Sequence, residues 1–170
     1  MALVRTLLVG LATAAGLLLR PIVTLAEERV EVGRPPDEVI RSFRDRMSSG
    51  DDVIAAGGDR VVRRFSGDAG RLRYRTVEVV SFAPTSITFE HLRGPFAMCR
   101  ERFDAVPRGG GTILTHSGTF ALRGGLFTWP LARTAVKRAF ERHVRDHMQS
   151  LVGEAGAHEL AAEHRPPPLT

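Results

Sequence analysis

Five strand-like runs follow one another in the middle of this sequence, and they constrain the fold more than any other feature. The runs cover residues 60–65, 71–80, 86–92, 96–106 and 112–122. The connections between them are short, and those at residues 66–70, 93–95 and 107–111 are rich in Gly or Pro. Short turns of this kind join neighbouring antiparallel strands. The sequence therefore predicts an antiparallel meander.

Helical periodicity appears on both sides of the meander. A short strand-like stretch at residues 29–32 is followed by Pro35-Pro36 and the acidic pair Asp37-Glu38, which is a typical helix start. Residues 126–152, or 130–152, carry apolar side chains at the spacing of one long amphipathic helix. This order predicts an α+β fold in which a curved antiparallel sheet of about six strands covers the long C-terminal helix. The stripe expected to face inward on the first helix is Val39, Ile40, Phe43 and Met47.

This layout resembles the START-like helix-grip superfamily (SRPBCC), which includes polyketide cyclases/dehydrases and lipid transport proteins. The resemblance covers roughly residues 28–152 and is carried by four stretches: residues 30–39, Gly94-Pro95-Phe96, Gly110-Gly111-Thr112 and residues 126–152. It implies a cavity between the sheet and the C-terminal helix that takes an apolar small molecule. Some members of the superfamily cyclise or dehydrate polyketides, and others only carry or sense a ligand.

The first 26 residues have a different character. Residues 6–19 form an uncharged run between Arg5 and Arg20. Three interpretations compete: a signal peptide cleaved after residues 24–26, a single-pass membrane anchor over residues 2–26, and an interfacial tail. We favour the anchor, with the snorkelling Arg5 and Arg20 at its two ends. More arginines follow the segment than precede it, which predicts the folded domain on the cytoplasmic side; a cleaved signal peptide would instead export it.

Length and composition limit the remaining possibilities. The 170 residues give room for one folded domain, which we place at residues 28–152, after the hydrophobic segment 1–26 and before a flexible tail at 153–170. The single cysteine excludes an internal disulfide and a multi-thiolate zinc site. Without residues 1–26 there are 22 basic and 19 acidic residues, too small an excess to indicate a nucleic-acid partner. We predict no metal, cofactor or catalytic residue.

Hairpin register predicts which side chains face the C-terminal helix. We expect Val106 opposite Thr112 and Leu92 opposite Pro95. The face turned to the helix then holds Ile87, Phe89, His91, Phe96, Met98, Arg100, Arg102, Leu114, His116, Phe120 and Leu122. The residues expected to face away are Glu90, Cys99, Glu101 and Thr115.

Polar side chains on this face, and on the helix that covers it, are the candidates for orienting a ligand carbonyl or carboxylate. The predicted ligand-binding residues are Tyr74, Phe89, His91, Met98, Arg100, Arg102, His116, Phe120, Phe140, His143 and His147, with Glu78 as an alternative to Tyr74. A structural interpretation stays open, in which these polar groups lie at a rim or are satisfied by neighbouring carboxylates. His143 and His147 have a spacing that metal sites use, but the glutamate of the zinc-protease pattern is missing.

Three functions fit these observations. The first is binding of a hydrophobic small molecule or lipid in the cavity of a membrane-anchored domain. The second is an accessory structural subunit of a membrane protein complex. The third is an aromatase/cyclase-like enzyme, for which His116 with Arg102, or His143 with Tyr74, would supply the acid and the base.

Overall fold

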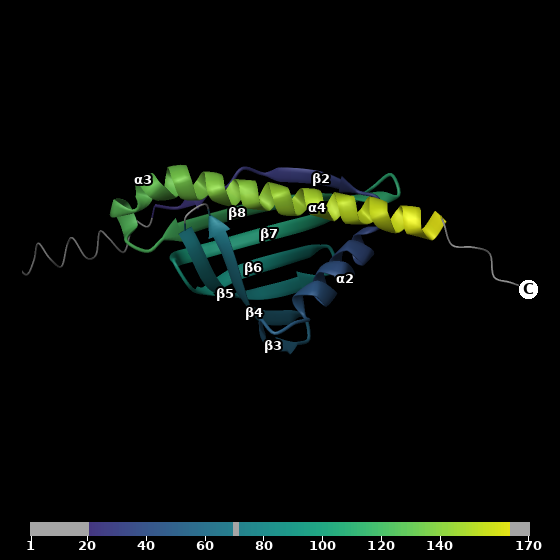
Figure 1. Cartoon of the computed structure of the whole chain (residues 1–170), viewed down its shortest axis with the longest axis horizontal. Coiled ribbons are helices and arrows are strands. Elements are labelled where there is room, and N and C mark those ends of the chain that lie inside the picture. Colours follow the sequence, from purple (N-terminus) through teal and green to yellow (C-terminus); the bar gives the residue numbers. More distant parts are fainter. Residues whose placement is uncertain (1–20, 70–71, 164–170) are drawn as a thin grey trace, which may run out of the picture.

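A computed structural model describes residues 21–69 and 72–163, and it shows a curved sheet with a long helix lying across it (Figure 1). The N-terminal hydrophobic helix expected before residue 21 and the last residues of the expected tail lie outside the described residues. The elements are β1 Val23–Thr24, β2 Glu28–Val32, α2 Pro36–Met47, β3 Val53–Gly57, β4 Arg60–Ala69, β5 Leu72–Ala83, β6 Ser86–Arg93, β7 Phe96–Arg108, β8 Gly111–Leu122, η1 Gly125–Phe127, α3 Trp129–Leu131, η2 Ala132–Val136 and α4 Lys137–Glu163.

The sheet is antiparallel and has eight strands in the order β1-β8-β7-β6-β5-β4-β3, with β2 also paired to β8. The predicted meander is confirmed as β4 to β8, and the predicted α+β helix-grip fold is confirmed with it. The first and last strands of the domain are neighbours, because β2 pairs with β8 along its whole length. Val23 and Thr24, which we assigned to the N-terminal segment, also belong to the sheet, as β1.

Helix α2 begins and ends where its sequence predicts. Pro35 stands before the first turn in an extended conformation, and the acidic residues occupy that turn. At the other end the guanidinium of Arg63 donates hydrogen bonds to the carbonyls of Arg46, Met47 and Ser49, which have no acceptor role inside the helix. A basic group at a helix C-terminus also complements the helix dipole. The predicted stripe from Val39 to Met47 is buried.

The long C-terminal helix is confirmed, and it begins with a short irregular stretch of η1, α3 and the π-helical turn η2. Helix α4 then continues past Val152, where we expected it to end, to Glu163. Within residues 21–69 and 72–163, no helix combines the length and apolar character needed to cross a membrane.

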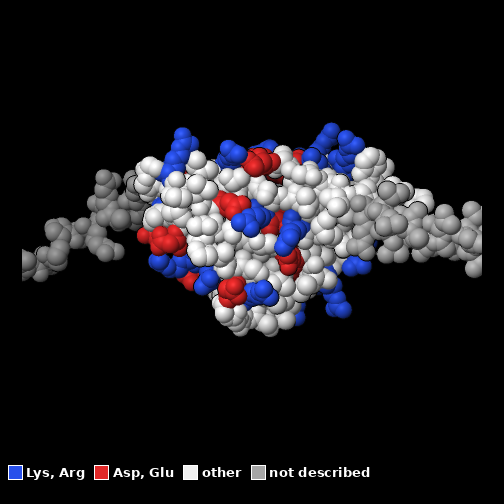
Figure 2. All heavy atoms as spheres, turned by 180° about the vertical axis from the view of Figure 1, so that it is seen from behind, with Lys and Arg blue, Asp and Glu red and all other residues white. Residues whose placement is uncertain are grey.

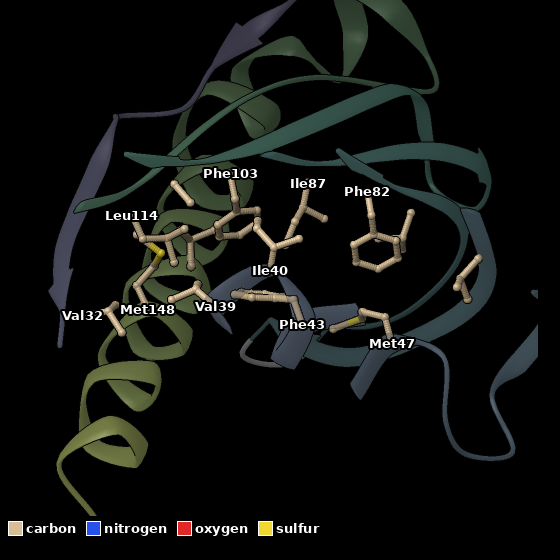
Figure 3. Close-up of a cluster of buried hydrophobic side chains, with 14 residues drawn as sticks. Val32, Val39, Ile40, Phe43, Met47, Phe82, Ile87, Phe103, Leu114 and Met148 are labelled. Carbon is tan, nitrogen blue, oxygen red and sulfur yellow. The ribbon is translucent and has the colours of Figure 1, made fainter. Parts of the chain in front are cut away.

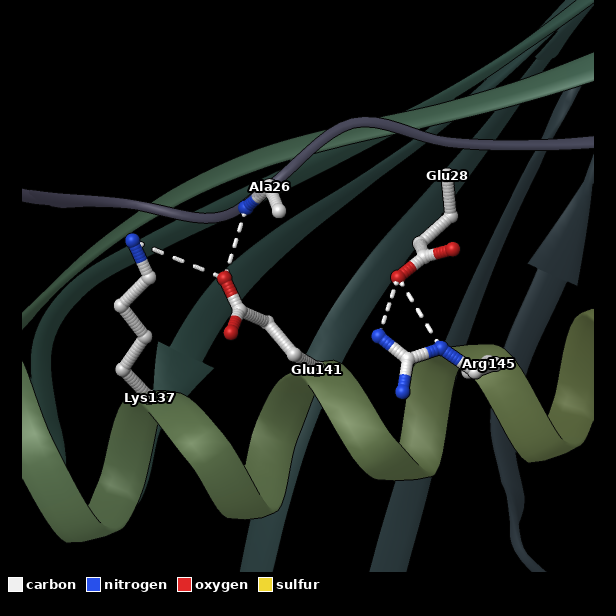
Figure 4. A network of polar contacts seen from close by, with 5 residues as sticks. All are labelled: Ala26, Glu28, Lys137, Glu141 and Arg145. Atoms are coloured by element: carbon white, nitrogen blue, oxygen red, sulfur yellow. Dashed lines mark hydrogen bonds and ion pairs between the residues drawn. The ribbon is translucent and has the colours of Figure 1, made fainter.

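Polar contacts fix α4 over the edge strands (Figure 4). The Ala26 N–H donates a hydrogen bond of 2.8 Å to Glu141 Oε1, which also lies 3.5 Å from Lys137 Nζ. One turn further on, Arg145 donates two hydrogen bonds to Glu28 Oε1, at 2.7 and 3.2 Å. The N-terminal strands therefore hold the helix at the β8 side of the sheet.

The inner face of the sheet carries two buried apolar clusters. The larger one lies between α2, α4 and the sheet (Figure 3) and includes Phe43, Ile87, Phe103, Leu114 and Met148. The smaller one gathers residues of β1, β7, β8 and η2. Its buried members are Val23, Leu25, Phe96, Cys99, Phe120 and Ala132. Phe140 of α4 packs against both clusters.

Candidate functional site

The register of β7 differs from the one we predicted, and the difference changes which of its side chains face the helix. Strand β7 runs on to Arg108, so that the turn shrinks to Gly109-Gly110, both with positive φ, and Pro107 lies opposite Thr112. A two-residue turn with two positive φ angles is the favoured geometry for joining twisted strands. The pairing of β7 with β8 is thereby shifted by one residue, which turns its side chains to the other face. The predicted register of β6 with β7, with Leu92 opposite Pro95, is also wrong, because Phe89 lies opposite Glu101.

The predicted inward positions Met98, Arg100 and Arg102 are therefore wrong, and so are the predicted outward positions Cys99 and Glu101. Cys99 is buried in the smaller cluster, and Glu101 reaches the inner face. An irregularity between Phe96 and Met98 brings Phe96 back to the inner face. The inward positions predicted on β6 and β8 agree with the structure: Ile87, Leu114, His116 and Phe120 are all buried.

The two arginines pair with acidic groups outside the helix grip. Arg100 lies 2.6 Å from Glu90, and Arg102 lies 2.7 Å from Asp104; all four side chains are substantially exposed. Basic and acidic side chains are also interspersed over the face of the molecule in Figure 2. Surface pairs of this kind contribute little to stability. The pair of His116 with Arg102, one of the two proposed for an enzyme, is not brought together.

Four ionisable side chains on adjacent strands separate the two apolar clusters. We call them the polar belt: Glu78 on β5, His91 on β6, Glu101 on β7 and His116 on β8. On β8, His116 stands between Leu114 of the larger cluster and Phe120 of the smaller one. Ligand sites are mostly apolar with a few polar groups that fix the orientation of the ligand, so the polar belt supplies the candidate polar groups of this interior.

His116 and Glu101 form a closed pair. His116 Nε2 lies 3.0 Å from Glu101 Oε2, and the histidine side chain is fully buried beside the Phe103 ring. The Glu101 side chain packs against Gly118, where a Cβ atom would come within 3.2 Å of Glu101 Cγ and 2.9 Å of Leu25 Cδ1. The pair gives His116 Nε2 and the Glu101 carboxylate a partner in the interior, whereas His116 Nδ1 has no hydrogen-bond partner among the described residues.

His91 and Glu78 form an open pair. His91 Nδ1 and Glu78 Oε1 are 3.9 Å apart, which is too long for a hydrogen bond. The His91 side chain is only 2% exposed, and neither of its ring nitrogens has a hydrogen-bond partner among the described residues. Its ring lies edge-on to Phe96 and against Gly94. A buried imidazole in this state can still donate one hydrogen bond and accept another.

The surroundings of the open pair favour neutral side chains. Burial, and then the negative charge of Glu101, raise the pKa of Glu78 to about 7, although the neighbouring Thr76 side chain opposes the shift. Burial, and then the positive charge of Arg123, lower the pKa of His91. Burial similarly raises the pKa of the Cys99 thiol, which leaves it a poor nucleophile.

A partly accessible aromatic surface adjoins the open pair. We call it the aromatic wall: Phe65 of β4, Tyr74 of β5, Phe89 of β6 and Phe140 of α4, all half-buried. The Phe65 and Phe89 rings are 6.0 Å apart, and the Tyr74 ring lies over Gly67 of the neighbouring strand, where a Cβ atom would clash with it. Large apolar side chains that keep some accessibility on an inner face offer a ligand a surface to cover.

The remaining predicted ligand residues lie at different depths. Phe120 is fully buried within the smaller cluster, where it packs against Phe96 and Phe140. His147 is half-buried, with its ring edge-on to Phe43 at 6.1 Å, whereas His143 is exposed on α4. No group of three His, Cys, Asp or Glu side chains suited to a metal ion occurs within residues 21–69 and 72–163. The ligand-binding role of all these residues stays a prediction.

The fold defines a helix-grip protein, and the polar belt crosses its otherwise apolar interior. A family model described as polyketide cyclase / dehydrase and lipid transport matches residues 24–153, and the chain belongs to this family. The superfamily suggested by the sequence is thereby confirmed. No sequence among the curated proteins matches the chain.

Solved structures share the fold. TTHA0849 from Thermus thermophilus superposes with a TM-score of 0.67 at 22% identity, covering 81% of this chain and 98% of that protein. The Zhui aromatase/cyclase from Streptomyces superposes with a TM-score of 0.68 at 18% identity, covering 79% of this chain and 94% of the enzyme. Identities this low establish a common fold and leave the ligand to be argued from the residues themselves.

Proposed function

We propose that this protein binds a hydrophobic small molecule or lipid that carries a hydroxyl or carbonyl group. The apolar body of the ligand would cover the aromatic wall, and its polar group would bind His91, with Glu78 beside it. Membership of a family that includes lipid transport proteins supports the apolar part of this proposal. The run at residues 6–19 would hold the binding domain at a membrane.

The observation that carries the proposal is the pair of unpartnered ring nitrogens on a buried histidine. Polar groups left without partners in an interior cost about 1–3 kcal/mol each, so proteins rarely keep them without a role. A ligand hydroxyl can donate to one imidazole nitrogen or accept from the other, and a carbonyl can accept. Either contact would give a His91 ring nitrogen a hydrogen-bond partner without placing a charged group in the interior.

A matched pair of probes tests the polar contact: 2-naphthol and naphthalene, which differ by one hydroxyl. Calorimetric titrations would use the full chain in nanodiscs, with empty nanodiscs as the baseline for partition into lipid. We expect saturable binding of both probes and about fivefold tighter binding of 2-naphthol, the factor that one net hydrogen bond provides. His91→Phe should retain naphthalene binding and lose the preference for 2-naphthol.

Arg142→Phe is the control, because Arg142 is exposed on α4, lies outside the predicted ligand-binding residues and should not affect the preference. Absence of saturable binding for both probes would refute the binding function. Equal affinities in the unaltered chain, or a preference that survives His91→Phe, would refute the role of His91 while leaving apolar binding in place.

An aromatase/cyclase-type reaction is a second candidate, favoured by one observation. Glu78, with a pKa of about 7, can take up or release a proton near neutral pH, and a neutral histidine stands beside it. A synthetic poly-β-ketone thioester would test this candidate. Cyclised, dehydrated product that forms with the unaltered chain but not with Glu78→Gln, while both bind 2-naphthol equally, would support it. No product above the uncatalysed background would exclude it for this substrate.

A further inference from the structure

One end of the molecule presents large apolar side chains to the surroundings. Phe127 is 98% exposed, and Leu126 and Leu131 are 57% and 47% exposed. Ile22 is 56% exposed, and the pairing of Val23 with Phe120 places it beside the end of β8, from which the chain runs into η1. These four residues form what we call the apolar end. In Figure 1 the described chain starts at the same end as α3.

The charged residues that flank Leu126, Phe127 and Leu131 in the sequence are all basic. Between Asp104 and Glu141 the chain contains no Asp or Glu, and residues 121–140 carry Arg123, Arg133, Lys137 and Arg138. The guanidinium of Arg133 lies 5.2 Å from the centre of the Trp129 ring. Exposed aromatic and aliphatic side chains with basic residues beside them are typical of surfaces that lie on anionic bilayers.

The position of the apolar end in the chain points to the same occupant. The uncharged run at residues 6–19 joins the described chain at Pro21, directly before Ile22. A lipid-bound segment entering here would bring the apolar end close to the same bilayer. Transfer of a Phe or Leu side chain from water to an apolar environment is strongly favourable. The exposed side chain of Phe127 would therefore be stabilised by contact with lipid.

We propose that the apolar end inserts into the headgroup region of an anionic lipid bilayer, as a second membrane contact besides residues 6–19. Arg123, Arg133 and Arg138 would bind lipid phosphates, whereas Lys137 pairs with Glu141. The two contacts together would fix the orientation of the helix-grip domain on the membrane. This proposal rests on the membrane contact proposed above for residues 6–19, and it does not depend on which ligand the interior binds.

The only tryptophan of the chain, Trp129, lies between Phe127 and Leu131 in the sequence and is half-buried against the smaller cluster, so its fluorescence can report on lipid at the apolar end. The full chain would be reconstituted in vesicles of equal parts phosphatidylcholine and phosphatidylglycerol, with dibrominated phosphatidylcholine as a quencher from within the bilayer. We expect a blue-shifted emission and strong quenching by the brominated lipid. Quenching should fall by at least half in the double variant Leu126→Ser/Phe127→Ser, and also in vesicles without phosphatidylglycerol.

Ile54→Ser is the matched control, because Ile54 is an exposed apolar residue on β3, outside the apolar end, and its loss should leave quenching unchanged. Circular dichroism would establish that the variants fold. Equal quenching in the double variant, or no quenching in unaltered chain that floats with the vesicles, would overturn the proposal. Trp129 shielded from acrylamide in lipid-free detergent, together with a doubled mass, would assign the apolar end to a second copy and also overturn it.

Discussion

Two glutamate–histidine pairs lie on the same face of one sheet, and only one of them is closed. His116 Nε2 and Glu101 Oε2 are 3.0 Å apart and pair inside the protein, which leaves only Nδ1 of His116 without a partner among the described residues. His91 and Glu78 are 3.9 Å apart, and the buried imidazole of His91 has no partner at either nitrogen among the described residues. The same residue types at a similar depth therefore have different consequences: the closed pair stabilises the fold, and the open pair is available to a ligand.

The largest expected effect is on the closed pair. His116→Phe keeps an aromatic ring in the core but leaves the Glu101 carboxylate buried without its partner, which should lower the free energy of unfolding by about 3 kcal/mol. His91→Phe removes a polar group that had no partner, so it should leave the free energy of unfolding unchanged or raise it by about 1–3 kcal/mol. Urea denaturation followed by circular dichroism measures both. Equal losses for the two variants would remove the distinction between the pairs.

The second prediction concerns the pH dependence that the open pair introduces. The pKa of Glu78 is 4.5 in the unfolded reference and about 7 in the folded chain. Between these values the folded state binds more protons, so this group lowers the free energy of unfolding as pH rises from 4.5 to 7, with no further loss above that range. Glu78→Gln cannot ionise and should be more stable than the unaltered chain by up to about 3 kcal/mol at about pH 8.

The difference in free energy of unfolding between Glu78→Gln and the unaltered chain, measured from below pH 4.5 to about pH 8, tests whether ionisation of Glu78 destabilises the fold. It should grow with pH through the stated window and then stay constant. Glu90→Gln provides the control, because Glu90 forms an exposed surface pair with Arg100 and should show no comparable trend. A difference for Glu78→Gln that is independent of pH would mean that the carboxyl is ionised at all these pH values, as in a solvated pair.

The comparison of the two pairs also shows which parts of the structure the sequence could predict. The meander and both helices follow from local signals: alternation, turn residues and helical spacing. Strand β1 has no such signal, because Val23 and Thr24 lie at the end of an apolar segment and become a strand only by pairing with β8. The extension of α4 past Val152 runs through Gly153 and Gly156, which predict a helix end by propensity alone.

The sequence predicts the inward side chains of β6 and β8 but not those of β7, because the register of β7 depends on the length of its turn. On β6 and β8 the strand period correctly placed His91 and His116 inward. On β7 the turn tightened to Gly109-Gly110, and this shift by one residue turned Arg102 outward and Glu101 inward. Glu101, the partner that closes the His116 pair, was therefore missed. The five-residue interpretation of that turn fitted its Gly and Pro content as well as the two-residue turn does.

The smallest predicted effect concerns Gly94, the residue against which the His91 ring of the open pair packs. Gly94 has a φ of +140°, and a Cβ atom there would lie 2.7 Å from the Arg75 carbonyl oxygen and 2.8 Å from His91 Cε1. Gly94→Ala should therefore destabilise the fold by about 2 kcal/mol and displace the His91 ring. Gly58→Ala is the matched control: Gly58 also has a positive φ, but a Cβ atom there meets nothing within 4 Å, so its cost should be about 1 kcal/mol. Only Gly94→Ala should weaken the preference for 2-naphthol over naphthalene. If both variants kept that preference, the position of the His91 ring would not decide how the open pair binds a polar group.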